Sequence, residues 1–89
     1  MNAVISVVGK DTIGILGKVA MKCSEYNANV IDVTQTIIGG YFTMFMVVDV
    51  EKIFIEFNDF IDVLVAYGEK EGLKINVMHE DIFNLMHKI

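Results

Sequence analysis

The chain has 89 residues, a formal net charge of −5 at pH 7, and 54% apolar residues. This length predicts one small domain, residues 1–89, because two separate cores cannot be built from so short a chain. Twelve acidic residues stand against seven lysines, with no arginine, which disfavours a nucleic-acid partner because such partners normally need a basic patch.

The apolar content also bears on location and assembly. No apolar run approaches the roughly 20 residues of a membrane span, and the N-terminus lacks the pattern of a signal peptide. The single cysteine, Cys23, excludes an intrachain disulfide and suits a reducing compartment. We therefore expect a cytoplasmic protein with no membrane partner. Because the apolar content exceeds what a small monomer easily buries, we also expect a homodimer.

The first predicted elements are a strand and a helix. Residues 2–8 are rich in Val and Ile and predict a buried strand that ends at Gly9. Asp11 or Thr12 can cap the first turn of the helix that follows, and the Asn-Ala-Asn stretch 27–29 ends it. The apolar positions of this helix, at the spacing of one face, are Ile15, Leu16, Val19, Ala20 and Cys23.

Residues 30–50 predict a β-hairpin around Gly39-Gly40, a pair that a two-residue turn accepts without steric cost. Residues whose numbers sum to 79 then face each other. The predicted core face carries Ile31, Val33, Ile37, Phe42, Met44, Met46 and Val48, with Gln35 as its one polar residue, which must find a hydrogen bond. The other face is mixed and is a candidate subunit contact through Phe45 and Val47. It carries Asp32, Thr34, Thr36, Tyr41, Thr43, Phe45, Val47 and Asp49.

The remaining residues predict a helix, a strand and a tail helix. Residues 55–72 carry an apolar stripe and end at Gly72, and residues 73–79 alternate as a last strand. The stripe consists of Phe57, Phe60, Ile61 and Leu64; the apolar side of the tail helix, 80–89, consists of Ile82, Leu85, Met86 and Ile89, with Lys88 near its end. The order β-α-β-β-α-β plus a short helix predicts an α+β, ferredoxin-like sandwich: a four-stranded antiparallel sheet with two helices on one face.

The Gly9–Gly14 segment fits neither nucleotide motif. The sequence Gly-Lys-Asp-Thr-Ile-Gly has the four intervening residues of a Walker loop but continues with Ile-Leu instead of Lys-Ser or Lys-Thr. A dinucleotide turn needs a second glycine at the position of Asp11, and an acid there would repel phosphates.

No catalytic constellation stands out, and no cofactor is predicted. Cys23 lies on the apolar face of its helix, which favours a buried structural thiol. His79 and His87 lie eight residues apart near two acids, and no third ligand of ordinary metal spacing accompanies them. Solvated polar positions explain the two histidines, and the alternative is a metal that binds adventitiously or between subunits. We predict no metal site and no enzyme.

Several of these residues together resemble an ACT domain, a small regulatory module of many amino-acid-metabolism enzymes. The matching features are Gly9-x-Asp11-x-x-Gly14, the apolar residues that follow it, and Asn29-Val30 at the start of the second strand. The stretches VVGKDTIGI, DVTQT, YFTMFMVVD and IFNLM are similar to an uncharacterised bacterial and archaeal family that consists of a lone ACT domain. That family is similar to the ACT modules of the glycine-cleavage regulator and of formyltetrahydrofolate deformylase.

The resemblance implies that the domains pair side by side, join their sheets and place amino-acid pockets at the interface. By position, Asp11 and Asn29 provide polar groups for the ligand, Gly14 lets backbone come close, and Ile13 replaces a common proline. Backbone N–H groups at the start of the first helix can receive a carboxylate, and Asp11 an ammonium group. The implied ligand-binding residues are Gly9, Asp11, Thr12, Ile13, Gly14 and Asn29.

The sequence therefore favours a non-enzymatic regulatory dimer that binds an amino acid and acts on an unknown effector protein. The alternative is a structural or adaptor dimerisation module without a small-molecule ligand. A small enzyme or metal protein that uses His79 and His87 is the third hypothesis.

Overall fold

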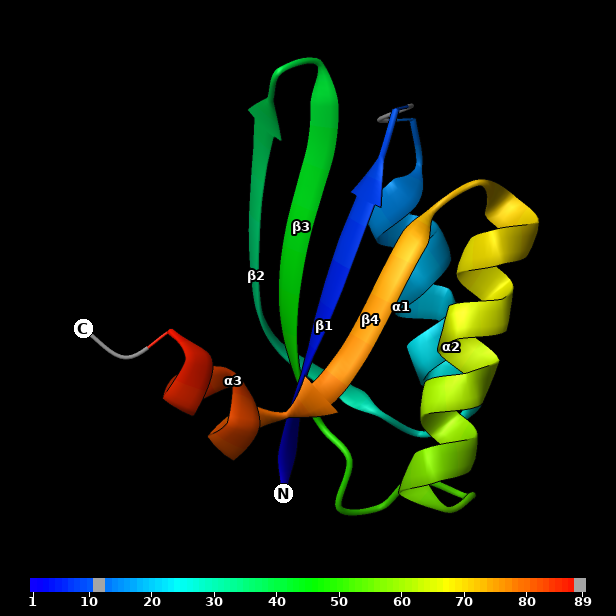
Figure 1. Cartoon of the computed structure of the whole chain (residues 1–89). Coiled ribbons are helices and arrows are strands. Elements are labelled where there is room, and N and C mark those ends of the chain that lie inside the picture. The colour runs from blue at the N-terminus through cyan, green and yellow to red at the C-terminus, as the bar shows by residue number, and fades with distance from the viewer. Residues whose placement is uncertain (11–12, 88–89) are drawn as a thin grey trace.

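The chain folds as a ferredoxin-like α+β sandwich, as predicted. The computed structural model describes residues 1–10 and 13–87. Figure 1 shows the elements in the predicted order, with a helix after the last strand. In chain order they are β1 (Asn2–Gly9), α1 (Ile15–Glu25), β2 (Asn29–Ile38), β3 (Tyr41–Asp49), α2 (Phe57–Glu71), β4 (Lys74–His79) and α3 (Glu80–Met86).

The four strands form one antiparallel sheet in the order β2-β3-β1-β4. Helices α1 and α2 cover one face of the sheet, and α3 lies on the other side, near the start of β1 and the end of β4 (Figure 1). Strand β2 is an edge strand at the border of the sheet, away from α2. The sheet therefore has one face that the helices cover except along β2, one mostly open face, and a free edge along β2.

The hairpin between β2 and β3 has the predicted register over most of its length. Both glycines of the turn have positive φ, 57° at Gly39 and 83° at Gly40, as a tight two-residue turn requires. The predicted pairs run from Ile38 opposite Tyr41 to Asp32 opposite Val47. A bulge at residue 31 then shifts the register by one residue.

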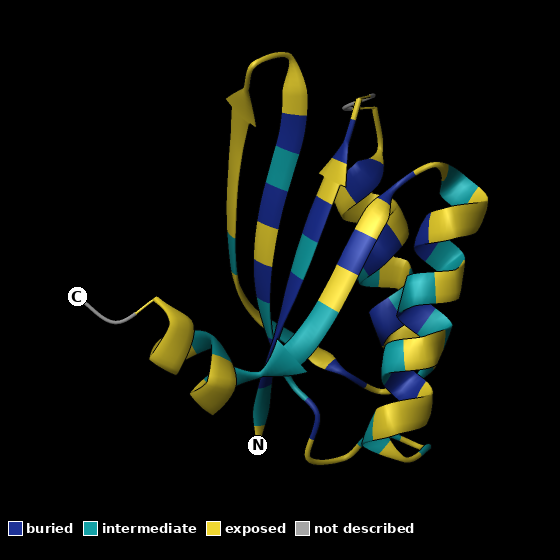
Figure 2. Ribbon diagram, viewed as in Figure 1, coloured by how far each residue is buried: buried dark blue, intermediate teal, exposed yellow. Residues whose placement is uncertain are grey.

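The core lies between the sheet and the two helices, as the dark bands of Figure 2 show. The four predicted core residues of β3 are buried. Burial alternates from residue to residue along most of β1 and at the start of β4, as expected for strands with one covered face. On β2 the predicted core face is confirmed only at Val33, which is partly buried against the core, whereas Ile31 is 52% and Ile37 66% exposed. Gln35 is exposed too, so it needs no internal hydrogen-bond partner. These residues lie on the edge strand, where the helix layer no longer covers the sheet.

Each helix buries one stripe and ends as predicted. Helix α1 buries Ile15, Val19 and Cys23, whereas α2 buries Phe60, Leu64 and Gly68. After α1, Asn27 has a φ of 64°, and the N–H of Ala28 reaches back to the Cys23 carbonyl at 3.0 Å. After α2, Gly72 has a φ of 73°, and the N–H of Leu73 reaches the Gly68 carbonyl at 2.7 Å. Both ends have the Schellman pattern, which explains the residues at 27 and 72.

The tail helix uses a different face from the predicted one. Ile82, Leu85 and Met86 are more than half exposed. Phe83 instead packs on the sheet, with its ring 5.9 Å from that of Phe45. The predicted Lys88 and Ile89 lie outside the described residues. The difference arises because α3 is short and its Phe83 finds an aromatic partner on the open face of the sheet.

Candidate functional site

The predicted ligand-binding residues begin at the end of β1. Gly9 is buried, and a Cβ atom there would lie 2.5 Å from Cδ2 of Leu73 and 3.7 Å from Cδ1 of Ile15. Gly9 therefore permits close packing between the end of β1, the start of α1 and the start of β4. Asp11 and Thr12 lie outside the described residues.

Gly14 occupies the N-cap position of α1, which the sequence analysis gave to Asp11 or Thr12. Its φ is 72°, and a Cβ atom there would have nothing within 4 Å. Conformation, rather than close approach within this chain, thus requires a glycine at this position. Ile13, just before it, is 80% exposed.

The start of α1 has no side-chain cap. Gly14 has no side chain with which to cap the helix, and the residues of the first turn include no acid. The positive end of the helix dipole lies at this turn.

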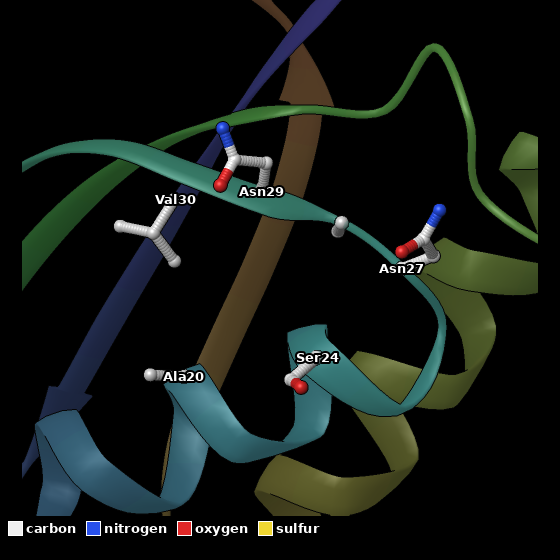
Figure 3. A pocket seen from close by; sticks show the side chains of 6 residues that line it. Ala20, Ser24, Asn27, Asn29 and Val30 are labelled. Carbon is white, nitrogen blue, oxygen red and sulfur yellow. The ribbon is translucent and has the colours of Figure 1, made fainter.

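Asn29 opens β2 and is exposed. It lines a hollow of about 370 Å³ between α1 and the start of β2 (Figure 3). Figure 3 shows Ser24 and Val30 on the helix side of this strand and the Asn29 amide on the other side. The residues of the hollow are Ala20, Ser24, Asn27, Ala28, Asn29 and Val30.

A second, more polar hollow of about 370 Å³ adjoins Asn29, lined by Asn27, Asn29, Asp49 and Lys52. The Asn27 amide donates to the Lys52 carbonyl at 3.0 Å, and an Asp49 carboxylate oxygen accepts from the N–H of Glu51 at 2.9 Å. Sequence reasoning missed Lys52 and Asp49 as neighbours of Asn29. The predicted register, in which paired residue numbers sum to 79, places Asn29 opposite Val50. The bulge at residue 31 shifts it to Asp49, so the sequence carried no signal for this neighbour.

The N-terminal amine adds a further charge at this end of the sheet. It lies 2.8 Å from a carboxylate oxygen of Glu51. The hydrogen bond with Glu51 raises the pKa of the amine above its usual value, and the charges of Asp49 and Glu80 act in the same direction. The hollow beside Asn29 thus has both an acidic and a basic residue, Asp49 and Lys52, in its lining.

One chain does not bring the two parts of the predicted site together. Gly9 pairs with Phe42 and Asn29 with Asp49, so the two lie at opposite ends of β3. Seven residues of strand separate these partners, which corresponds to about 23 Å. Gly9 and Asn29 therefore lie too far apart within one chain to contact the same small molecule.

The free edge of β2 is the surface through which a second copy could contribute. Ile38 and Tyr41 flank the two-residue turn and exchange backbone hydrogen bonds. Every second residue of β2 counted from Ile38 therefore bonds to β3, and the backbone N–H and C=O groups of the residues between them point away from β3. These residues are Val33, Gln35 and Ile37. An Asp32 carboxylate oxygen accepts from the N–H of Val33 at 2.9 Å. The N–H and C=O groups of Gln35 and Ile37 are thereby left facing the open edge.

The remaining chemical groups have structural roles. Cys23 is fully buried, and burial raises the pKa of its thiol to about 11, so at neutral pH it is a protonated thiol rather than a nucleophile. His79 is the N-cap of α3: its Nδ1 accepts from the N–H of Asp81 at 3.0 Å. His87 stacks on Phe83 with ring centroids 4.1 Å apart. Within residues 1–10 and 13–87, no three His, Cys, Asp or Glu side chains gather as metal ligands would.

The helices described in residues 1–10 and 13–87 include none with the length and apolar character needed to cross a membrane. The element order and the sheet topology define a ferredoxin-like α+β domain with an open sheet edge along β2. The model of the ACT domain family matches residues 2–77, and the chain belongs to that family.

Relatives with the same extent support this assignment. A UPF0237 protein of Listeria innocua is 46% identical over 89 residues, which is 100% of both chains. The solved structure of an ACT domain protein from Streptococcus pneumoniae is 37% identical, with a TM-score of 0.83 over 93% of each chain. The resemblance to a family of lone ACT domains is thereby confirmed.

Two solved structures of larger proteins share the fold. A formyltetrahydrofolate deformylase from Pseudomonas syringae has a TM-score of 0.75 at 14% identity, over 86% of this chain and 26% of its own. A candidate glycine cleavage system transcriptional repressor has a TM-score of 0.69 at 22% identity, over 89% of this chain and 47% of its own. Both relationships that the sequence implied are present at the level of fold.

Proposed function

We propose that this protein is a non-enzymatic, cytoplasmic regulatory module that binds an amino acid between two copies of the chain and passes the signal to an effector protein. The observation that carries the proposal is the placement of Gly9–Gly14 and Asn29 at opposite ends of a sheet whose β2 edge is free. A two-fold, antiparallel pairing of two β2 edges joins these ends.

The geometry of such a pairing follows from the register. Gly9 is level with Phe42, which pairs with Ile37 near the end of β2, whereas Asn29 is at the start of β2. Antiparallel pairing sets the start of one β2 strand beside the end of the other. Asn29 of one copy then lies at the same end of the joined sheet as the Gly9–Gly14 segment of the partner.

The proposed binding mode uses complementary charges. The N–H groups at the start of α1, which lacks an acid in its first turn, receive the ligand carboxylate. The Asp11 carboxylate receives the ammonium group, and the Asn29 amide from the other copy provides both a donor and an acceptor. Thr12, Ile13 and the backbone at Gly9 and Gly14 shape the rest of the pocket. No reaction is required of this site, and no cofactor or metal enters the proposal.

Thermal-shift measurements with each of the twenty amino acids test the proposal. A ligand that binds only the native state raises the melting temperature, by about 2.7 kcal/mol of stability at 100 times its dissociation constant. We expect at least one amino acid to do so, and Asn29→Ala to abolish the shift. Asn58→Ala, an exposed asparagine on α2, is the matched control and should retain it. No shift with any amino acid would remove the support for a sensor.

The second candidate is a structural or adaptor dimerisation module without a ligand. The observation that favours it is that the β2 edge exposes Ile37 and Ile38, at 66% and 63%, beside unpaired backbone groups. Such an edge promotes pairing whether or not a ligand binds. A stable dimer whose melting temperature responds to no amino acid would select this candidate.

A further inference from the structure

The open face of the sheet carries a second feature that the proposed function does not use. Helix α3 lies across one end of this face, and its Phe83 ring stands 5.9 Å from Phe45. Beneath the helix, Val4 is only 4% exposed, although it points away from α1 and α2. The helix therefore covers part of a face that is otherwise open.

A hollow of about 200 Å³ remains between Phe83 and the sheet. Its walls are apolar, and the Ser6 and Thr43 hydroxyls provide hydrogen-bonding groups on its floor. The His87 ring, stacked on Phe83 at 4.1 Å, lies at the outer wall. Val4, Val8, Phe45 and Met78 complete its lining. This volume suits a single ring or a short alkyl chain.

The polarity of the open face changes along β1 and β4. Val4 pairs with Met78 beneath α3, Ser6 pairs with Asn76 one step further, and Val8 pairs with Lys74 beyond that. Because every second residue of a strand shares a face, these three pairs form successive rows on the open face. The rows pass from apolar through neutral polar to cationic over about 13 Å.

A second hollow of about 370 Å³ continues from Val8 at the cationic end. Lys74 and Lys10 line it, together with Tyr41 and Glu71. The Glu71 carboxylate lies 3.4 Å from Nζ of Lys18, so Lys18 rather than Lys74 neutralises its charge. Among the described residues, the Lys74 ammonium group has no carboxylate within ion-pair distance.

We propose that this face is a binding site for a small amphipathic anion. Its ring or alkyl body lies between Phe83 and the sheet, and its carboxylate, or another single anionic group, lies at Lys74. The charge gradient on the face, rather than its apolar character alone, selects this ligand class over a neutral molecule. The apolar part of the site lies on the opposite side of the sheet from the start of α1, and the cationic hollow adjoins the site proposed above at Gly9 and Lys10.

The test uses 3-phenylpropionate as the probe and 3-phenylpropanol as its uncharged counterpart, in an NMR titration of the labelled full chain. The expected result is saturable shifts of the amide signals of Ser6, Thr43 and Phe83, with a dissociation constant of about a millimolar for so small a molecule. The alcohol should bind at least about threefold more weakly, since the interaction with an exposed lysine is modest.

Matched variants locate the two ends of the ligand. Lys74→Gln should weaken binding of the carboxylate about threefold and leave binding of the alcohol unchanged, whereas Lys70→Gln, on α2, should change neither. Phe83→Ala should weaken binding of both probes about tenfold. Leu85→Ala removes an outward-facing side chain of the same helix, 76% exposed, and should have no effect.

Val8→Glu keeps the test decisive if Phe83→Ala detaches α3. Val8 is 38% exposed, so the fold tolerates the change, and the new carboxylate should abolish binding of 3-phenylpropionate. Three outcomes would overturn the proposal: shifts that do not saturate, equal affinity for acid and alcohol, or binding that survives Val8→Glu. A dimer that Val8→Glu dissociates, without any probe binding to the wild type, would also overturn it and assign the face to a second copy. Asn29→Ala should leave probe binding intact, which separates this site from the one proposed above.

Discussion

Gly9 and Asn29 lie at opposite ends of the same sheet, since Gly9 pairs with Phe42 and Asn29 with Asp49 at the two ends of β3. A separation of about 23 Å exceeds the length of any amino acid. The residues that sequence similarity assigns to one ligand therefore cannot meet on it within one chain. A shared pocket requires a second copy, and the free β2 edge is where the geometry allows one.

The edge-pairing proposal predicts that Gln35→Pro prevents dimerisation without unfolding the chain. The N–H of Gln35 points away from β3, so proline removes no bond from the internal ladder, and edge strands tolerate it. It does remove a donor and adds bulk at the centre of the free edge. We expect sedimentation equilibrium to show a monomer for Gln35→Pro and a dimer for wild type.

Gln35→Thr is the control for this experiment, because threonine keeps the backbone donor and suits a strand. It should remain a dimer. If Gln35→Pro is as dimeric as wild type while circular dichroism shows an intact fold, the copies associate through another surface.

The space around two helical glycines predicts opposite effects when each is replaced by alanine. A Cβ atom at Gly68 would lie 2.7 Å from Cγ1 of Ile75 and 2.9 Å from the Leu73 carbonyl oxygen. Gly68→Ala should therefore destabilise the fold by about 1–3 kcal/mol, although alanine favours helix. Gly17→Ala, in α1 with nothing within 4 Å of the new Cβ, should raise stability by up to about 1 kcal/mol. Urea unfolding measures both, and a Gly68→Ala protein as stable as wild type would contradict the packing.

The buried thiol of Cys23 predicts a loss of stability in alkali. Burial raises its pKa from 9.0 to about 11, so between these values the unfolded chain has released a proton that the native chain retains. The unfolded state then binds fewer protons, and the free energy of unfolding falls with rising pH, by at most about 1.4 kcal/mol per pH unit from this group.

Lysines and tyrosines titrate in the same range, so the measurement compares wild type with Cys23→Ala. Urea unfolding at about pH 8 and about pH 10 should give a steeper loss of stability for wild type than for the variant. Cys23→Ala should be less stable at neutral pH because it leaves a small cavity. Equal slopes in the two proteins would show that the thiol does not titrate with a raised pKa.

The sequence predicted features that local chemistry determines. Gly39-Gly40 set the hairpin register, and Asn27 and Gly72 adopt the left-handed backbone that ends a helix. The sequence did not reveal which strand would lie at the edge. Ile37 alternates like a core residue, but β2 extends beyond the helix layer and leaves it exposed. Periodicity reports which face a side chain is on, and only the tertiary arrangement decides whether that face is covered.

The same limit applies to α3 and to the candidate site. The apolar side chains of 80–89 predicted an inward face, yet α3 turns Phe83 toward the sheet, where its ring packs against Phe45. Asn29 could be identified by its place at the start of β2. Its distance from Gly9 could not be anticipated, because it follows from how β1 and β2 flank β3.

The central claim, that the ligand site is shared between two copies, is tested most directly by mixing two inactive variants. Asp11→Ala and Asn29→Ala each carry one defect, so each alone should fail to bind the amino acid that the thermal-shift screen identifies. When the two variants are unfolded together and refolded at equal concentrations, half of the dimers are mixed. One of the two sites in each mixed dimer is intact, because it combines Asp11 from one chain with Asn29 from the other. Calorimetric titration should then recover about one quarter of the wild-type binding capacity. If the site is formed within one chain, every site in the mixture retains a defect. Binding capacity that stays absent after mixing would therefore contradict the account.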